Sequence, residues 1–228
     1  MEAFGDTYVP TVSVVILSHR RELVGEAMAS VFAQTFTDYQ VLVQFCETYW
    51  GDKLNDIIKA ARGKYVCVLC DDDLLDPTYL AEMVEALTIS GADIAYSDTR
   101  IFGSRPDRVD VLPEFSLETL QKKCVPWMTA VWKREWFAHV GGYDPKMLYL
   151  DWDFWLSCAE RGATGVKVAK PLFHAREHET NGTVGIAMNQ HSEAWLKFRI
   201  KHGWTPWGSF PKEGFPLPMV DAVEVPHE

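Results

Sequence analysis

The chain has 228 residues, of which 47% are hydrophobic and 24% are charged, and its formal net charge is -10. This length is enough for one sizeable core, so we expect one domain with a C-terminal extension. The acidic balance and the lack of a basic run disfavour nucleic acid as a partner, because its capture depends on neutralising phosphates. No stretch approaches the roughly 20 apolar residues of a membrane helix, and the N-terminus lacks the pattern of a secretory signal, so we expect a cytoplasmic protein.

The five cysteines are odd in number and have no convincing zinc-binding spacing. Cys67 and Cys70 are separated by two residues, but they lie on a predicted buried strand where only one of them can face a ligand. We therefore expect reduced thiols rather than a disulfide framework or a zinc site.

The first ninety residues alternate between predicted strands and helices. Residues 11–17 form a β-branched run without polar alternation, which predicts a strand that is covered on both faces and central in a parallel sheet. The other predicted elements are helices at 22–32 and 54–61, strands at 39–43 and 65–69, and a helix that begins at Asp76-Pro77. This order implies right-handed βαβ crossovers, in which ligands bind at the carboxyl ends of the strands.

The second half of the chain is less regular. Short strands are predicted at 94–96, 131–132, 166–168 and 171–174, and helices at 152–161 and 186–202. A proline- and glycine-rich tail follows, which suits a lid, a dimer contact or an extended wrap, and the sequence does not choose among these.

Three consecutive carboxylates, Asp71, Asp72 and Asp73, follow the strand predicted at 65–69. Like charges this close raise one another's pKa or recruit a cation. Oxygen ligands suit Mg²⁺ or Mn²⁺, which keep positions open for substrate phosphates. A solvated acidic loop that caps the next helix at Asp76 is the structural alternative.

Several segments together resemble the family 2 glycosyltransferases, in the order expected for that family. The matching segments are 12–21, 30–35, 54–55, 61–66, 71–73, 141–144 and 150–155. The resemblance implies an α/β GT-A fold, with a Rossmann-like, mostly parallel central sheet flanked by helices and followed by a C-terminal helix and tail. It implies one domain at 1–203, with a nucleotide-binding half at about 10–100 and an acceptor half at about 101–203, and a tail at 204–228.

The resemblance implies a divalent metal, Mn²⁺ or Mg²⁺, that bridges the diphosphate of a nucleotide-sugar donor. Asp72 is then a direct ligand with Asp73 in support, and Asp71 lies near the ribose or the metal. Cys70 stands where many relatives have the first carboxylate. His178 matches a histidine that relatives place close to the metal, and imidazole suits Mn²⁺ better than Mg²⁺; His174 is the competing candidate.

Asp151 matches the family's catalytic base, which implies an inverting displacement on an acceptor hydroxyl. Two alternatives remain from the sequence. The base is Asp153 instead, or Asp151 only caps the helix that follows it.

The nucleotide contacts implied by the resemblance are Ser18, His19 and Arg21. Many relatives carry an Asp pair for uracil after the second strand, but this chain reads Val43-Gln44-Phe45-Cys46-Glu47. The base contact is therefore assigned to Glu47 or Gln44, and a UDP-sugar is the default donor.

Trp127 and Trp152 are candidate acceptor contacts, because aromatic faces stack on sugar rings. Asp153 is a third candidate. The acceptor is a glycan, a lipid-linked sugar, a protein or a modified base, and a homodimer is open. Two other functions compete with the transferase. A sugar-phosphate nucleotidyltransferase is disfavoured because residues 18–22 contain no glycine, and a non-catalytic glycan-binding protein is disfavoured by the retention of Asp72 and Asp151.

Overall fold

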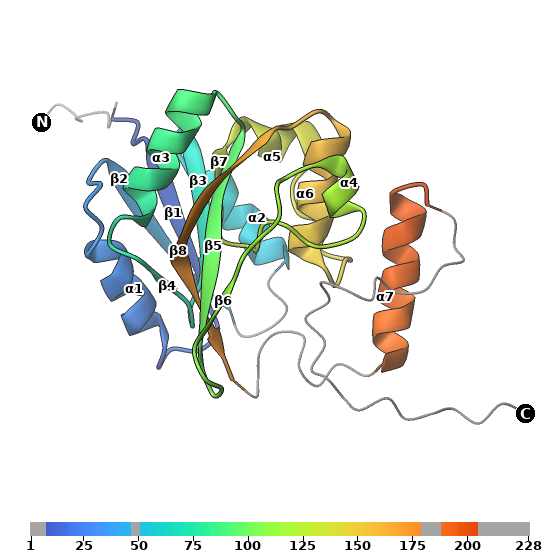
Figure 1. Ribbon diagram of the computed structural model, residues 1–228, viewed down its shortest axis with the longest axis horizontal. Coiled ribbons are helices and arrows are strands. Elements are labelled where there is room, and N and C mark those ends of the chain that lie inside the picture. Colours follow the sequence, from blue (N-terminus) through green and yellow to red (C-terminus); the bar gives the residue numbers. More distant parts are fainter. Residues whose placement is uncertain (1–7, 47–50, 179–187, 205–228) are drawn as a thin grey trace, which may run out of the picture.

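A mixed sheet runs through the molecule and carries helices on both faces (Figure 1). The computed structural model describes residues 8–46, 51–178 and 188–204. The strands are β1 (Val12–Ser18), β2 (Tyr39–Phe45), β3 (Tyr65–Cys70), β4 (Leu74–Leu75), β5 (Ile94–Gly103), β6 (Arg108–Asp110), β7 (Val131–Lys133) and β8 (Gly165–Glu177). The helices are α1 (Val24–Phe32), α2 (Gly51–Ala60), α3 (Tyr79–Ser90), α4 (Leu117–Leu120), α5 (Glu135–Val140), α6 (Leu150–Glu160) and α7 (Met188–Lys201).

The parallel part of the sheet is built on β1. This strand lies between β2 and β3 and is parallel to both, which confirms the prediction of a central first strand. All seven of its residues are buried, as its β-branched composition predicts. Beyond β3 the order continues β7-β5-β8-β4; β5 and β8 are parallel, whereas β7 is antiparallel to both its neighbours and β4 is antiparallel to β8.

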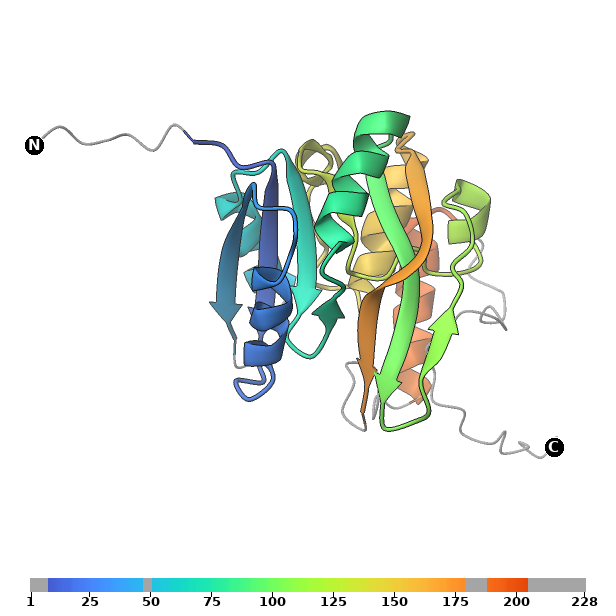
Figure 2. The ribbon, with the colours of Figure 1, turned by 60° about the vertical axis from the view of Figure 1, so that its left-hand side comes forward.

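Two hydrophobic cores lie on opposite faces of this sheet. Val15 and Leu17 of β1 belong to the core that includes residues of α2 and α6, whereas Val14 and Ile16 belong to the core under α1 and α3. The alternation follows from the period of two along a strand. Figure 2 shows α1 and α3 in front of the strands, and α6 behind them.

Strand β8 corrects the prediction of two separate short strands at 166–168 and 171–174. It is continuous from Gly165 to Glu177 and pairs with β5 along its length, with a register irregularity where Ser97 faces Val168 and Asp98 faces Pro171. Proline has no amide hydrogen for a ladder bond, so the irregularity accommodates Pro171 without ending the strand.

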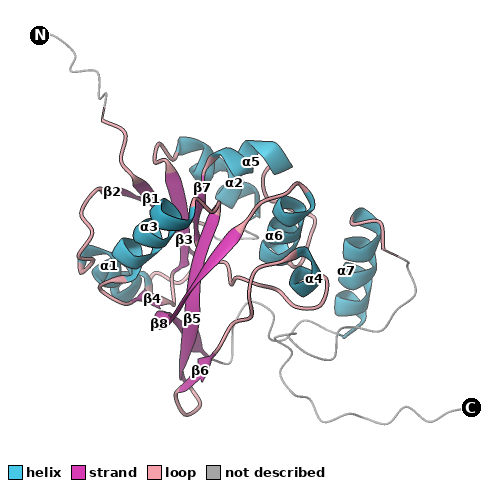
Figure 3. Cartoon of the chain, turned by 45° about the horizontal axis from the view of Figure 1, so that its top comes forward, coloured by secondary structure: helices cyan, strands magenta, loops and turns pink. Residues whose placement is uncertain are grey.

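Helix α7 packs on α6 through aromatic side chains. Trp195 and Phe198 of α7 lie with their ring centroids 5.4 and 5.2 Å from that of Trp152 on α6. Figure 3 shows α7 beside α6 and α4, on the side of the molecule away from α1. The predicted tail lies almost entirely outside the described residues, so the domain boundaries stay a prediction. Among the described residues, no helix is both long and apolar enough for a membrane span.

Candidate active site

The acidic triplet lies in the turn between β3 and β4, at the carboxyl end of the parallel strands. Leu17 of β1 is in register with Cys70 of β3, so the loop that follows Ser18 lies beside this turn. All three carboxylates are buried or nearly so. Carboxylates at such a position need hydrogen-bond donors or cations around them, and the structure supplies both.

Asp71 holds the loop after β1 in place. Its Oδ2 atom accepts hydrogen bonds from the backbone amides of His19 and Arg20, at 2.9 and 2.6 Å. Its side chain is 1% exposed. Asp71 therefore connects the ends of β1 and β3, and its carboxylate is bonded to backbone amides of the chain.

Asp72 is the point where three distant segments meet. Its Oδ2 atom lies 2.9 Å from Nη1 of Arg20 and 2.9 Å from Nε2 of His178. His178 directly follows β8, which the register of β4 and β8 brings beside the acidic turn. The predicted association of Asp72 with His178 is therefore present in the geometry, although the two residues are 106 positions apart.

Asp73 completes the turn and is held by β8. Its Oδ1 atom accepts a hydrogen bond of 2.9 Å from the backbone amide of Arg176, whose Nε donates to the carbonyl of Asp72 at 2.9 Å. Burial, with the neighbouring charge of Asp72, raises the pKa of Asp73 well above its ordinary value. Arg20 and Arg176 act in the opposite direction, and a bound cation would add to their effect.

One cluster of side chains that could hold a metal ion is found among the described residues. Ligand atoms of Cys70, Asp72 and Asp73 lie within 4.8 Å of one another, and His178 contacts Asp72 from the side. Two carboxylates suit Mg²⁺ or Mn²⁺, and a thiol with an imidazole favours Mn²⁺ over Mg²⁺. The donor set therefore fits a divalent cation. Cys70 is the member that the sequence interpretation did not include as a ligand.

Asp151 lies in the first turn of α6, and its Oδ1 atom accepts a hydrogen bond of 2.8 Å from the backbone amide of Trp152. Burial raises its pKa above the ordinary value, while hydrogen bonds, among them one with Cys124, act in the opposite direction. Its negative charge is in turn one cause of the raised pKa of Cys70. Asp151 therefore lies close enough to Cys70 of this cluster for its charge to act on the thiol.

Two predicted acceptor contacts are buried in this structure. Asp153 is 1% exposed, and its carboxylate binds Lys201 at 2.8 Å and His202 at 3.1 Å. Trp152 is 2% exposed and donates its Nε1 hydrogen to the carbonyl of Leu120. Both side chains point into the packing around α6, so neither offers a surface to an acceptor. The same burial disfavours Asp153 as the base relative to Asp151, which is less buried.

The predicted nucleotide contacts are gathered around the end of β1. Ser18 is fully buried, and its hydroxyl has no hydrogen-bond partner in the part of the chain that the structure describes. His19 is half exposed, and the Arg21 guanidinium lies 4.7 Å from the ring centroid of Phe45. Glu47 lies outside the described residues. Gln44, its alternative, donates to the carbonyl of Phe45 at 2.8 Å.

Trp127 and His174 have largely structural surroundings. Trp127 packs partly buried against both cores, with its ring edge-on to Phe173 at 6.1 Å between centroids. His174 pairs with Leu74 in the ladder between β8 and β4, and burial lowers its pKa. His178, rather than His174, is the histidine at the acidic turn.

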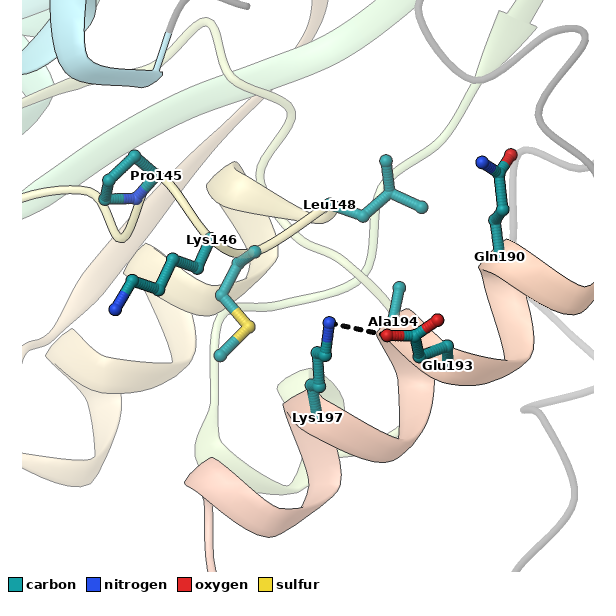
Figure 4. A pocket seen from close by; sticks show the side chains of 8 residues that line it. Pro145, Lys146, Leu148, Gln190, Glu193, Ala194 and Lys197 are labelled. Carbon is teal, nitrogen blue, oxygen red and sulfur yellow. Dashed lines mark ion pairs between the residues drawn. The ribbon is translucent and has the colours of Figure 1, made fainter.

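A separate surface groove lies between α7 and the loop before α6 (Figure 4). Lys146 and Met147 line it on one side, and Glu193 and Lys197 of α7 form an ion pair of 2.7 Å on the other. None of the predicted site residues lines this groove. The candidate active site is therefore the acidic turn and not this groove.

Comparison with protein families gives one match, which covers the acidic turn. Residues 47–130 match the model of glycosyl transferase family 2. The match confirms the resemblance to the family 2 glycosyltransferases. A search of curated proteins gives no match.

Solved structures of similar fold cover most of the chain. TarS 1-349 of S. aureus in complex with UDP-GlcNAc has a TM-score of 0.69 and 13% identity, over 84% of this chain and 66% of that one. The mannosyltransferase PcManGT from Pyrobaculum calidifontis, in complex with GDP-Man and Mn²⁺, has a TM-score of 0.59 and 14% identity, over 90% of this chain and 67% of that one. The chain thus spans about two thirds of the length of these two solved chains and has the same GT-A fold.

Proposed function

We propose that this chain is a glycosyltransferase that moves a sugar from a nucleoside-diphosphate donor to an acceptor hydroxyl, with a divalent cation and with inversion. The observation that carries the proposal is the cluster of Cys70, Asp72 and Asp73 at the carboxyl end of β3, with His178 against it and Asp151 close enough for its charge to act on the Cys70 thiol. The family 2 match over the same turn supports it.

Asp72 and Asp73 are the proposed metal ligands, and His178 and Cys70 complete the donor set. A bound Mn²⁺ or Mg²⁺ would neutralise the negative charge that develops on the departing nucleoside diphosphate. Asp71 acts differently, because its carboxylate is occupied by two backbone amides. It positions the loop that carries His19 and Arg21, and through that loop the donor's nucleoside.

Asp151 is the proposed catalytic base. It accepts the proton of the acceptor hydroxyl while that oxygen forms its bond to the anomeric carbon, and the bond from this carbon to the diphosphate oxygen breaks on the opposite face. Burial raises the pKa of Asp151, which makes the carboxylate a stronger proton acceptor than an exposed aspartate. Its place in the first turn of α6 holds it in one orientation.

The donor is proposed to be a UDP-sugar by default, as in the similar TarS structure with UDP-GlcNAc, with a GDP-sugar as the alternative that the PcManGT structure with GDP-Man suggests. Ser18, His19 and Arg21 are the proposed contacts of its nucleoside, and Glu47 stays a prediction for the base. The free hydroxyl of Ser18 suits a polar group of the ligand. The acceptor half is proposed to span about residues 101–203, and the acceptor class stays open.

A donor screen tests the proposal. The chain is incubated with UDP- and GDP-sugars in Mn²⁺, and hydrolysis or transfer is followed by mass spectrometry, with the Asp72→Asn variant as the control. We expect one donor to be turned over by the unaltered chain and not by the variant. Glycan binding without turnover of any donor would instead support the non-catalytic alternative.

A further inference from the structure

Arg20 was not among the residues singled out in the sequence, yet its side chain lies inside the candidate metal site. Its Nη1 atom is 2.9 Å from Oδ2 of Asp72 and 2.5 Å from Nε2 of His178. Its Nε atom is 3.5 Å from Oδ1 of Asp71. The side chain is 15% exposed, so these contacts are made largely away from water.

One guanidinium group therefore bonds the two side chains that come from opposite sides of the turn. Arg176 is the other arginine at the turn, but its Nη2 atom pairs with Glu26 at 2.6 Å and its Nε atom donates to a backbone carbonyl. The Arg20 guanidinium forms a direct ion pair with the Asp72 carboxylate. The arginine guanidinium offers this carboxylate a positive charge and several hydrogen-bond donors.

We propose that Arg20 is a built-in counter-cation, which neutralises Asp72 before a divalent cation binds and has to leave Asp72 and His178 when one does. The proposal rests on the metal site of the proposed function. Asp72 Oδ2 and His178 Nε2 are the atoms that would coordinate a cation. Nη1 of Arg20 lies within hydrogen-bond distance of both. The backbone amide of Arg20 stays bonded to Asp71, so the side chain can move without the loop.

Two consequences follow for cation binding. Release of Arg20 makes cation binding less favourable. The apparent affinity is lowered because only the fraction of molecules in which Arg20 has left the site can bind the cation. A guanidinium that remains nearby also repels the incoming charge. Loss of the positive charge at position 20 should therefore tighten cation binding, whereas loss of a group that only supports the site's shape would weaken it.

The test is a direct titration of Mn²⁺ without nucleotide, in which free Mn²⁺ is measured by its EPR signal. Arg20→Gln removes the charge, Arg20→Lys keeps it on a group without the planar fork, and Arg21→Gln removes a neighbouring charge outside the cluster. We expect Arg20→Gln to bind Mn²⁺ about tenfold more tightly than the unaltered chain, with Arg20→Lys in between. Arg21→Gln should stay within about twofold, since its guanidinium lies over Phe45.

Thermal stability gives a second measurement. Without Mn²⁺ the Arg20→Gln variant should have a lower melting temperature than the unaltered chain, since Asp72 has lost its counter-ion. Saturating Mn²⁺ should reduce this difference in melting temperature. If this variant does not fold, tighter binding by Arg20→Lys supports the proposal, and equal or weaker binding contradicts it. Equal or weaker Mn²⁺ binding by folded Arg20→Gln overturns the role of Arg20 alone. A lack of Mn²⁺ binding by every protein overturns the metal site as well.

Discussion

The two acidic segments of the chain look alike in sequence and behave in opposite ways in the structure. In the turn after β3, Asp72 and Asp73 converge with Cys70 into one cluster. In α6, Asp151 and Asp153 diverge: the charge of the first acts on Cys70 of that cluster, and the second is buried against Lys201 and His202 of the C-terminal segment. A turn at a strand end gathers neighbouring carboxylates, whereas a helix directs residues two apart to different sides.

The sharpest test of this contrast is to neutralise each helix carboxylate in turn. We expect Asp151→Asn to lower the rate of sugar transfer by about 100-fold or more, the scale of a lost general base. Donor binding with Mn²⁺ should persist, as measured by calorimetry. Asp153→Asn is the matched control, because it removes the same charge from the same helix. Undiminished transfer by Asp151→Asn would assign the base to another residue.

Asp153 should instead affect stability. Its substitution by Asn removes one of the two carboxylate partners of Lys201 and of His202, which keep Asp144 and Glu160 respectively. We therefore expect a loss of about 1 to 2 kcal/mol in the free energy of unfolding. Urea denaturation measures this loss, and transfer per folded molecule should remain. A variant that is fully stable but inactive would reverse the roles assigned to the two carboxylates.

The same contrast predicts a pH dependence for Asp151. Its pKa in the folded chain is raised above 3.8, so transfer should fall as pH falls through that raised value, by about tenfold per unit below it. Between pH 3.8 and the raised pKa, the Asp151 carboxyl is mostly protonated in the folded chain and mostly ionised in the unfolded chain. The contribution of Asp151 to stability therefore decreases as pH rises from 3.8 through the raised pKa. In Asp151→Asn this decrease should be absent from the pH profile of stability, and its persistence would contradict the assignment.

The parts of the fold that depend on local pattern were predictable from the sequence. The buried run of β1 and the turn after β3 follow from neighbouring residues, and the structure confirms both strands. The roles of Arg20, Cys70 and Asp153 were not predictable in this way. They depend on contacts across the sheet, such as the pairing of Arg20 with His178 over 158 positions, which no local pattern encodes. The sequence also did not predict that β8 continues through Pro171, because this continuity depends on a register irregularity in the pairing of β8 with β5.

Thermal melting shows whether a cation at the acidic turn holds the donor's diphosphate. The chain is melted with UDP or GDP in Mn²⁺, and again in EDTA, beside Asp72→Asn. We predict that one nucleotide raises the melting temperature by about 5 °C at 100 times its dissociation constant, only with Mn²⁺ and only in the unaltered chain. An equal rise in EDTA would show that the nucleotide binds without a cation at this turn.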